Sequence, residues 1–484
     1  MELIFEKSRP DVPDIYFPAE QPAETRPARD LIPESLRYDR PRDLPSLSEL
    51  EVVRHVLALC RRQVGIDSTF YPLGSCTMKY NPKINEAVAR FPQFAGLHPL
   101  QPDETTQGTL QVLYELERGL AQVTGMAEVT LNPLAGAHGE LTGLLLIKAY
   151  HDSRGDTKRK KILVPDAAHG TNPASAAICN YEVVTIPGTP EGLVDLKGLE
   201  AALSDEIAGL MLTNPNTLGL FERDIVKIAK MVHDAGGQLY YDGANLNAIL
   251  GVARPGDMGF DVVHMNLHKT FSTPHGGGGP GAGPVGVKEH LRPFLPVPWI
   301  EKKGERYAIS ADRPKTIGRV GAFYGNANVL VRAYTYYRKH GRNGLPQVGK
   351  HAVLNAAYVL AKLQKTYNRP LGLPCMHEFI IQPTDAMLAK GVRTLHLAKR
   401  LIDYGYHPPT IYFPLVVKEA MMIEPTETES KATLDGFVAA MEKIAQEALE
   451  TPDLVINAPH TSVVGKVDET KAARQLDLRF CACD

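Results

Sequence analysis

Lys269 is the residue whose surroundings most strongly suggest chemistry. It lies within residues 266–275, among two histidines and several hydroxyl side chains, and four glycines follow at 276–279. A lysine amine can react with a carbonyl group, and glycines let a ligand approach the backbone closely. The segment therefore predicts a lysine that meets a carbonyl cofactor. A surface lysine on a flexible loop is the alternative, because glycine runs are also common in linkers.

Three upstream segments place small or polar residues directly after short apolar runs. Gly136 and Ala137 open a predicted helix, whose first N–H groups could hold a phosphate. His169 follows the run 162–164, and an imidazole can stack on a flat ring or move a proton near neutral pH. Asp242 ends the run 239–241 and could pair with a protonated pyridine nitrogen. Ala244, two residues later, is small enough to lie under such a ring.

Each of these segments also has an ordinary structural explanation. Gly136 could serve only a strand–helix turn, His169 could be a capping or core histidine, and Asp242 could be a helix N-cap. Thr213, in the loop 213–217, could bond a phenolic oxygen of the ring or belong to a plain turn. The order glycine turn, histidine, aspartate and lysine, each at a strand end, is more specific than any one segment. It favours pyridoxal 5′-phosphate as the cofactor.

The elements that must position these residues are predicted between about 107 and 290, where helical segments alternate with short apolar runs. The runs expected to form strands lie at 129–131, 162–164, 183–186, 210–212, 239–241, 261–263 and 285–287. Continuous apolar strands separated by helices indicate a mostly parallel sheet covered on both faces. In such sheets ligands bind at the carboxyl ends of the strands, where the candidate residues lie.

We expect three parts in the chain. Residues 1–105 form an N-terminal arm, rich in proline up to about 45, with a helical period over 46–64. Residues 106–325 form the large α/β domain. Residues 326–484 form a smaller α+β domain. Its predicted elements are a long helical stretch at 327–365, strands near 378–381 and 411–413, and helices near 384–403 and 431–448.

The composition is that of an ordinary globular protein. The 484 residues include 53 basic and 55 acidic side chains, and the net charge is −2. Neither a nucleic-acid partner nor a membrane partner is predicted, since no basic excess and no apolar run of about 18–20 residues occurs. The N-terminus lacks the apolar segment of a signal peptide, so we expect a cytoplasmic protein.

The six cysteines show no CxxC pair and no repeated spacing. A zinc site or a disulfide framework is therefore not predicted, and we expect no bound metal. Cys481 and Cys483 near the C-terminus are interpreted as two free thiols in a tail, with metal or redox use as the alternative.

Five segments together resemble glycine dehydrogenase (decarboxylating), the P-protein family of the glycine cleavage system. They are residues 73–79, 168–176, 242–245, 267–281 and 422–430. The resemblance covers about 65–460. The long form of that family fuses two homologous halves, and this chain resembles only the lysine-bearing C-terminal half, the β subunit (subunit 2) of the split form. The resemblance implies a fold-type-I pyridoxal-phosphate enzyme, a separate α subunit (subunit 1) and an α2β2 heterotetramer. The proline-rich arm would then contact the partner subunit.

The resemblance also implies the activity. Such an enzyme decarboxylates glycine and passes the remaining aminomethyl group to the lipoyl arm of H-protein. Lys269 would bind the cofactor aldehyde, Asp242 would keep the ring nitrogen protonated, and His169 would stack on the ring or transfer a proton. The remaining residues expected to contact the cofactor are Ala244, His268, Gly136, Ala137, Thr171, Thr213 and Thr270. His377 and Glu378 would line the substrate channel.

Two other functions stay open. Another fold-type-I enzyme, such as an aminotransferase or a cysteine desulfurase, uses the same lysine, aspartate and histidine, and Cys375 is the candidate reactive cysteine of a desulfurase. A scaffold subunit that has lost its chemistry is the second alternative. The lysine and the aspartate argue against it, because a scaffold needs neither.

Overall fold

The structure is a computed structural model that describes residues 2–9, 28–37, 44–275 and 281–476. It divides into two compact units, Met1–Gly65 and Ile66–Asp484. The glycine run at 276–279 and the terminal cysteines Cys481 and Cys483 lie outside the described residues. The three-part division expected at residues 105 and 325 stays a prediction.

The described residues of the first unit form the helical elements α1 (Ala28–Leu31), η1 (Glu34–Leu36) and α2 (Glu49–Cys60). Helix α2 begins at Ser48, whose hydroxyl accepts a hydrogen bond from the Glu51 N–H while the Glu51 carboxylate accepts one from the Ser48 N–H. This reciprocal capping box satisfies backbone donors that a helix start leaves free. It fixes the first turn of the helix expected within 46–64.

The second unit is built on a seven-stranded sheet. Its strands are β1 (Glu128–Thr130), β2 (Lys161–Pro165), β3 (Glu182–Ile186), β4 (Ile207–Thr213), β5 (Gln238–Gly243), β6 (Val262–Met265) and β7 (Val285–Val287). The strand order is β1-β7-β6-β5-β4-β2-β3, and β7 runs antiparallel to both of its neighbours while the others are parallel to one another. The expected α/β class with a mostly parallel sheet is confirmed.

Helices cover both faces of this sheet, which explains why its central strands are apolar throughout. They are α5 (Gln107–Thr124), α6 (Gly136–Ser153), α7 (Thr171–Ile178), α8 (Leu196–Ala202) and α9 (Ile225–Asp234). Successive strand residues point to opposite faces. Accordingly, Tyr241 packs in one hydrophobic cluster with the leucines of α5, and Tyr240 packs in another with Leu144 and Ile147 of α6.

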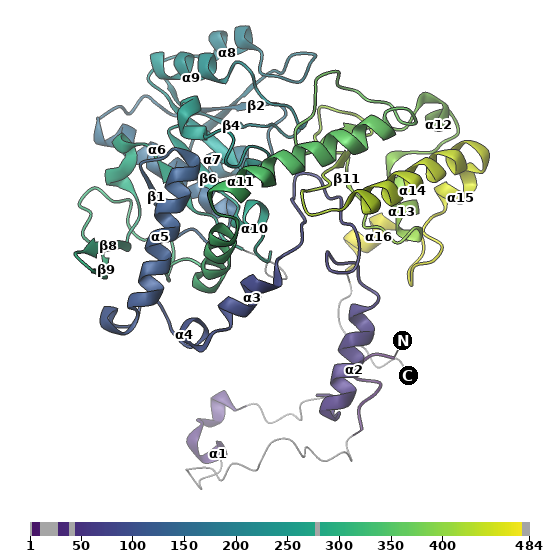
Figure 1. Cartoon of the computed structure of the whole chain (residues 1–484), viewed down its shortest axis with the longest axis horizontal. Helices are drawn as coiled ribbons and strands as arrows, with labels where there is room; N and C mark the ends of the chain where they lie inside the picture. The colour runs from purple at the N-terminus through teal and green to yellow at the C-terminus, as the bar shows by residue number, and fades with distance from the viewer. Residues whose placement is uncertain (1, 10–27, 38–43, 276–280, 477–484) are drawn as a thin grey trace. The chain divides into compact units, whose positions relative to one another are not determined.

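A hairpin and a long helix follow the sheet in the chain. The hairpin of β8 (Trp299–Lys303) and β9 (Arg306–Ser310) was not anticipated from the sequence. Helix α11 (Ala327–Leu363) matches the long helical stretch, but it is two helices joined at Gly341, whose φ of 57° breaks the helical path. Figure 1 shows α11 in green, passing from the large sheet toward α14.

The C-terminal part has a small antiparallel sheet in the order β10-β12-β11, with β10 (Phe379–Ile381), β11 (Thr410–Ile411) and β12 (Met421–Ile423). Strand β12 was not predicted. The helices here are α12 (Asp385–Ala389), α13 (Thr394–Asp403), α14 (Lys431–Glu450), α15 (Pro452–Ile456) and α16 (Glu469–Arg474). The remaining short elements of the second unit are α3 (Lys83–Ala89), α4 (Pro92–Ala95), η2 (Asp103–Thr105), η3 (Leu246–Ala248), η4 (Pro255–Met258), α10 (Leu267–Thr270) and η5 (Glu289–Phe294).

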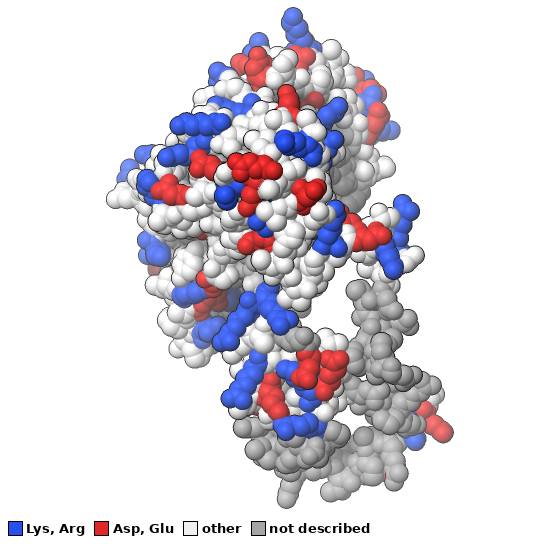
Figure 2. Space-filling model, turned by 90° about the vertical axis from the view of Figure 1, so that its right-hand side faces the viewer, with Lys and Arg blue, Asp and Glu red and all other residues white. Residues whose placement is uncertain are grey.

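The surface carries charges of both signs. Figure 2 shows basic and acidic side chains interspersed over the face that it presents, in keeping with a net charge of −2. Among the described residues, no helix combines the length and the apolar character that crossing a bilayer requires.

Candidate active site

Residues expected to do chemistry converge at the carboxyl ends of the parallel strands. Asp242 is the penultimate residue of β5, Lys269 lies in α10 just after β6, and His169 follows β2. Gly136 opens α6 after β1. The carboxyl ends of parallel strands meet at one edge of the sheet, so residues far apart in sequence become neighbours there.

Lys269 is buried, with 8% of its surface exposed, and its Nζ donates a hydrogen bond to the Ser75 carbonyl at 2.8 Å. Ser75 has a φ of 62°, a left-handed conformation that is uncommon outside glycine and worth attention near a functional site. The loop 73–79, one of the five segments that carry the family resemblance, therefore supplies the partner of the lysine.

A second buried lysine fixes the helix that carries Lys269. Lys79 donates to the Thr270 carbonyl at 3.0 Å and to the Asn247 side chain at 2.9 Å, and it forms an ion pair with Glu427 at 2.6 Å. Its side chain is 1% exposed. Removing one partner of such a pair leaves an uncompensated buried charge, so this contact constrains the end of α10 strongly.

Asp242 is held as an anion by its neighbours. Its carboxylate accepts hydrogen bonds from Asn172 at 2.9 Å and from the Ala244 N–H at 3.0 Å, and His264 Nε2 lies 3.3 Å away. Burial by itself would raise the pKa of Asp242. The His264 ring, the Asn172 amide, the Ala244 N–H and the Lys269 charge outweigh it and hold the pKa below its usual range. A carboxylate in this state can pair with a protonated ring nitrogen.

His169 and Thr171 form a joined pair after β2. The Thr171 hydroxyl lies 2.8 Å from His169 Nδ1 and donates to the buried Glu140 carboxylate at 2.7 Å. The His169 ring also contacts Phe413 edge-on, with 5.5 Å between ring centres. These contacts leave the imidazole half-buried with a fixed orientation, as a ring-stacking residue requires.

Small residues and unpartnered donors near α10 fit a phosphate group. A Cβ on Gly136 would lie 2.4 Å from Asn266 Oδ1, so only glycine allows α6 to begin beside α10. Helix α6 has no side-chain cap, and its first backbone N–H groups lack intrahelical partners. Among the described residues, the buried Thr270 Oγ1, Thr273 Oγ1 and His268 Nδ1 have no hydrogen-bond partner.

Buried polar atoms are rarely left unpaired, so this cluster indicates a ligand. Hydroxyls, an imidazole and a helix N-terminus are donors suited to an anion. Burial, followed by the charges of His275 and Lys269, lowers the pKa of His268 to about 3, so this ring is neutral at physiological pH. Ala137 is exposed in the first turn of α6, where only its backbone could contribute.

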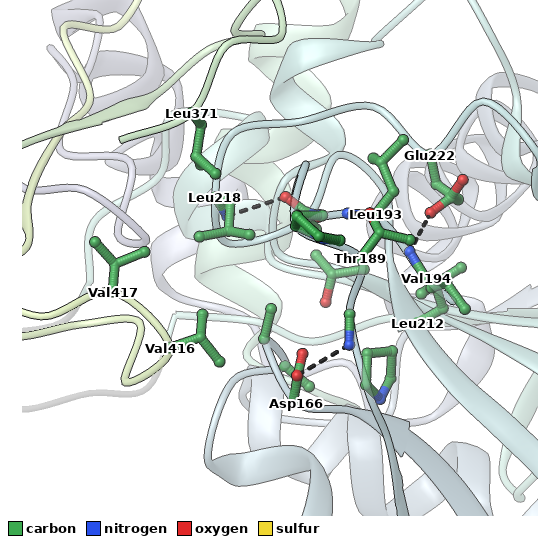
Figure 3. A pocket seen from close by; sticks show the side chains of 18 residues that line it. Asp166, Thr189, Leu193, Val194, Leu212, Leu218, Glu222, Leu371, Val416 and Val417 are labelled. Atoms are coloured by element: carbon green, nitrogen blue, oxygen red, sulfur yellow. Dashed lines mark hydrogen bonds between the residues drawn. The ribbon is translucent and has the colours of Figure 1, made fainter. Parts of the chain in front are cut away.

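Thr213 is placed differently from the other predicted residues. It ends β4, is buried with its Oγ1 unpartnered among the described residues, and lines a separate cavity of about 230 Å³. Figure 3 shows this cavity between Leu193, Leu218 and Val417. The cavity's two carboxylates, of Asp166 and Glu222, already accept backbone N–H groups of Gly188 and Val194. Lys269 is not part of its lining.

His377 and Glu378 lie on the Lys269 side and are fully buried. Glu378 accepts the Ser75 N–H at 2.7 Å, so one residue of the 73–79 loop contacts both Lys269 and this carboxylate. Burial raises the pKa of Glu378 to about 7, although the Ser75 N–H and the Lys269 charge oppose it. Burial lowers the pKa of His377 to about 3.

Several residues that the structure brings to the site were not predicted from the sequence. His264 interrupts an otherwise apolar buried strand, and that interruption was the available signal. Glu140 follows the glycine turn directly, but its contacts with Thr171 and with Ser175, at 2.9 Å, depend on packing of α6 against α7. Nothing in the sequence around Lys79, apart from the family motif that contains it, predicted that this lysine would lie at the site.

Cys375 does not resemble a reactive cysteine. Burial raises the pKa of its thiol to about 11, and nucleophilic cysteines instead have lowered pKa values. This environment speaks against the desulfurase alternative.

Solved structures share this fold. Glycine decarboxylase (P-protein) of the glycine cleavage system, in inhibitor-bound form, matches with a TM-score of 0.73 at 20% identity, over 86% of this chain and 94% of that chain. Glutamate decarboxylase of Lactobacillus brevis matches at 0.65 and 12% identity, over 87% and 98%. Cysteine desulfurase of Thermococcus onnurineus matches at 0.60 and 15% identity, over 78% and 95%. The expected fold-type-I architecture is thereby confirmed.

Sequence relatives are much closer. A protein of Exiguobacterium sibiricum named probable glycine dehydrogenase (decarboxylating) subunit 2 is 61% identical over 453 residues, covering 94% of this chain and 92% of its own length. One of Caldanaerobacter subterraneus subsp. tengcongensis with the same name is 57% identical over 478 residues, covering 99% and 98%. The model of the family described as glycine cleavage system P-protein matches residues 27–300, and that of glycine dehydrogenase, C-terminal domain, matches 348–463. Because the first model spans more than half of the chain and the relatives span nearly all of it, the chain belongs to the glycine cleavage P-protein family, as an enzyme of the glycine dehydrogenase (decarboxylating) subunit 2 type.

Proposed function

We propose that this chain binds pyridoxal 5′-phosphate at Lys269, decarboxylates glycine and passes the aminomethyl group to the lipoyl arm of H-protein. The observation that carries the proposal is a buried lysine beside a buried, ionised aspartate at the carboxyl edge of the sheet. When bound, the cofactor supplies an electron sink for the pair of electrons that the departing CO2 leaves behind.

The side chains of the chain would hold and orient the reacting groups. Asp242 would accept a hydrogen bond from the protonated ring nitrogen and so keep that nitrogen protonated, since its carboxylate is kept ionised by His264 and Asn172. The His169 imidazole would cover one face of the ring, with Ala244 beside Asp242 below it. The donors at Thr270, His268 and the start of α6, Gly136 and Ala137, would hold the phosphate. Thr171 would act by fixing His169, and Thr213 stays a weaker candidate because it lines the neighbouring cavity.

The proposal includes partners. Relatives carry the name subunit 2, which supports a second subunit, and we propose subunit 1 (α) in an α2β2 heterotetramer. Lipoylated H-protein would be the acceptor of the aminomethyl group, and the cytoplasm the location.

Absorbance and trapping test the cofactor assignment. The purified chain, incubated with pyridoxal phosphate, should turn yellow, and borohydride should fix the label on the peptide that contains Lys269. Lys269→Ala should lose both signals. Lys288→Ala serves as the control, because Lys288 is half-buried and its Nζ, like that of Lys269, donates to a backbone carbonyl, here that of Gly125 at 3.2 Å. An unchanged label in Lys269→Ala would contradict the assignment.

A turnover assay tests the reaction. The chain together with subunit 1 and lipoylated H-protein should release labelled CO2 from carboxyl-labelled glycine, and Lys269→Ala should abolish the release. Sulfide from cysteine, without CO2 from glycine, would instead support the desulfurase alternative.

A further inference from the structure

Two glutamates face each other beside Lys269 because of a strand register. Strands β10 and β12 are antiparallel and pair Phe379 with Ile423. Glu378 directly precedes the first of these residues and Glu424 directly follows the second, so the register sets the two glutamates opposite each other. Carboxylate atoms of both, with a ring nitrogen of His377, lie within 4.8 Å of one another. All three residues are at most 1% exposed.

The hydrogen bonds divide the two carboxyl groups into different roles. Glu378 accepts on both oxygens, from the Ser75 N–H at 2.7 Å and from the Asn245 side chain at 3.4 Å, which suits an anion. Glu424 accepts only from Thr77, on Oε1, and its Oε2 has no partner among the described residues. Two like charges directly opposite each other in a buried sheet are destabilising, so one of the groups is neutral.

The proton belongs on Glu424. Burial, followed by the charge of Glu378, raises the pKa of Glu424 well above its usual value. The unpartnered Oε2 is then a buried O–H group with no acceptor among the described residues. Both ring nitrogens of His377 are likewise buried without a hydrogen-bond partner. Buried donors and acceptors without partners are rare, so these atoms indicate that a ligand binds beside them.

Ser75 connects the pair to Lys269, because its N–H donates to Glu378 at 2.7 Å and its carbonyl accepts from Lys269 Nζ at 2.8 Å. The proposed function needs an acid there. When CO2 leaves glycine, the remaining electron pair forms a C–S bond to one sulfur of the lipoyl disulfide. The S–S bond breaks, and its electrons reside on the second sulfur as a thiolate. That thiolate must take up one proton to complete the reduced thiol.

We propose that Glu424 is the proton donor to this departing thiolate, and that Glu378 is a positioning residue that keeps the proton on Glu424. The inference rests on the proposed function, because it concerns the second half of that reaction. After transfer, Glu424 is left as a carboxylate opposite Glu378, and it regains a proton from solvent before the next turnover. The step uses no oxidant besides the disulfide itself.

An infrared measurement tests the protonation state without any turnover. Glu424→Gln in the full chain should remove the carbonyl-stretch band of one protonated carboxyl group. Glu117→Gln is the matched control, since Glu117 is a second buried glutamate with a pKa raised to about 8, and it lies in α5. It should remove one such band as well, but leave the chemistry unchanged. A Glu424→Gln spectrum identical to that of the wild type would overturn the proposal.

Two disulfide acceptors whose leaving thiols differ in acidity test the chemical role of Glu424. In the complex with subunit 1, loaded with pyridoxal phosphate, Glu424→Gln should slow transfer to lipoylated H-protein roughly 100-fold or more, the usual contribution of a general acid. Glu424→Asp should recover part of the rate. With an aromatic disulfide, whose leaving thiolate needs no proton, Glu424→Gln should equal the wild type. Equal losses with both disulfides would show a merely structural role and sink the idea.

The pH dependence of the transfer rate also tests whether Glu424 is the proton donor, and it needs only lipoylated H-protein as the acceptor. The wild-type transfer rate should fall as pH rises through the titration of Glu424. His377 and Glu378 lie within 4.8 Å of its carboxylate, and the charges of Glu427 and Lys269 also act on it. Glu424→Gln should lack this alkaline fall, and Glu117→Gln should keep it. If the wild type releases no CO2 from glycine, the proposed function fails; if turnover is normal and Glu424→Gln matches it, only this inference fails.

Discussion

Single residues set the charge of the site through a buried chain of contacts from Tyr240 to His264 to Asp242. The Tyr240 hydroxyl lies 2.7 Å from His264 Nδ1, and His264 Nε2 lies 3.3 Å from Asp242. The histidine is 1% exposed, so water cannot replace either contact. Asp242 therefore depends on His264, which is itself oriented by Tyr240.

We predict that His264→Phe lowers the free energy of unfolding by about 1.5–3 kcal/mol at neutral pH, the range for hydrogen bonds to charged groups. The folded-state pKa of Asp242 is lowered, so its contribution is present above the unfolded pKa and is lost as pH falls through the folded value. The deficit of the variant should therefore shrink in acid. Urea unfolding at several pH values measures it.

Tyr240→Phe is the control, since it removes only the outer contact. It should cost about 1 kcal/mol, as for a neutral hydrogen bond, with little dependence on pH. A deficit of His264→Phe that persists unchanged in acid would show that packing, and not the Asp242 charge, explains it.

At the scale of elements, helix α5 carries a buried acid at its contact with the loop before α11. Glu117 accepts a hydrogen bond from the Tyr324 hydroxyl, and burial raises the pKa of its carboxyl from 4.5 to about 8. An acid with a raised folded-state pKa contributes stability that is fully present below pH 4.5. This contribution is lost as pH rises through 8.

Glu117→Gln should remove this pH dependence. Between pH 4.5 and 8 the wild type should lose stability relative to the variant, at up to about 1.4 kcal/mol per pH unit. Glu115→Gln, in the same helix, is the control, because the Tyr334 hydroxyl holds the pKa of Glu115 below its usual value. Urea midpoints that move in parallel for Glu117→Gln and wild type would contradict the prediction.

At the scale of the whole molecule, the N-terminal arm exposes apolar side chains that this chain leaves uncovered. Helix α2 exposes apolar side chains one and two turns apart, including Leu50 at 52% and Leu57 at 51%. Apolar residues on one stripe of a helix normally face a protein surface. This supports the proposal that the arm contacts subunit 1.

We predict that Leu50→Asp with Leu57→Asp weakens the complex with subunit 1 at least tenfold while the bound cofactor chromophore stays intact. Sedimentation of mixed subunits measures the association. Val226→Asp on α9, where Val226 is 67% exposed, is the control and should bind subunit 1 normally. Equal weakening by both changes would show a nonspecific effect of added charge. The isolated chain should show little turnover with H-protein.

The sequence by itself determined the sheet and the order of its chemical residues. Parallel strands end at one edge, so Asp242, Lys269 and His169 could be brought together from their positions after apolar runs alone. Burial on both faces makes the central strands apolar throughout, and this is why their positions could be predicted from apolar runs. The hairpin β8–β9 and strand β12 were missed because they are short and only partly buried or closely followed by polar residues.

Only the tertiary structure decided which polar groups outside these strand ends touch the site. Glu378 and Glu424 meet because β10 and β12 pair antiparallel, and Lys79 reaches α10 because its loop packs against the end of that helix. Neither contact leaves a mark in local periodicity. Pairing between distant segments depends on register and packing, whereas a residue's own sequence neighbours report only its element and its face.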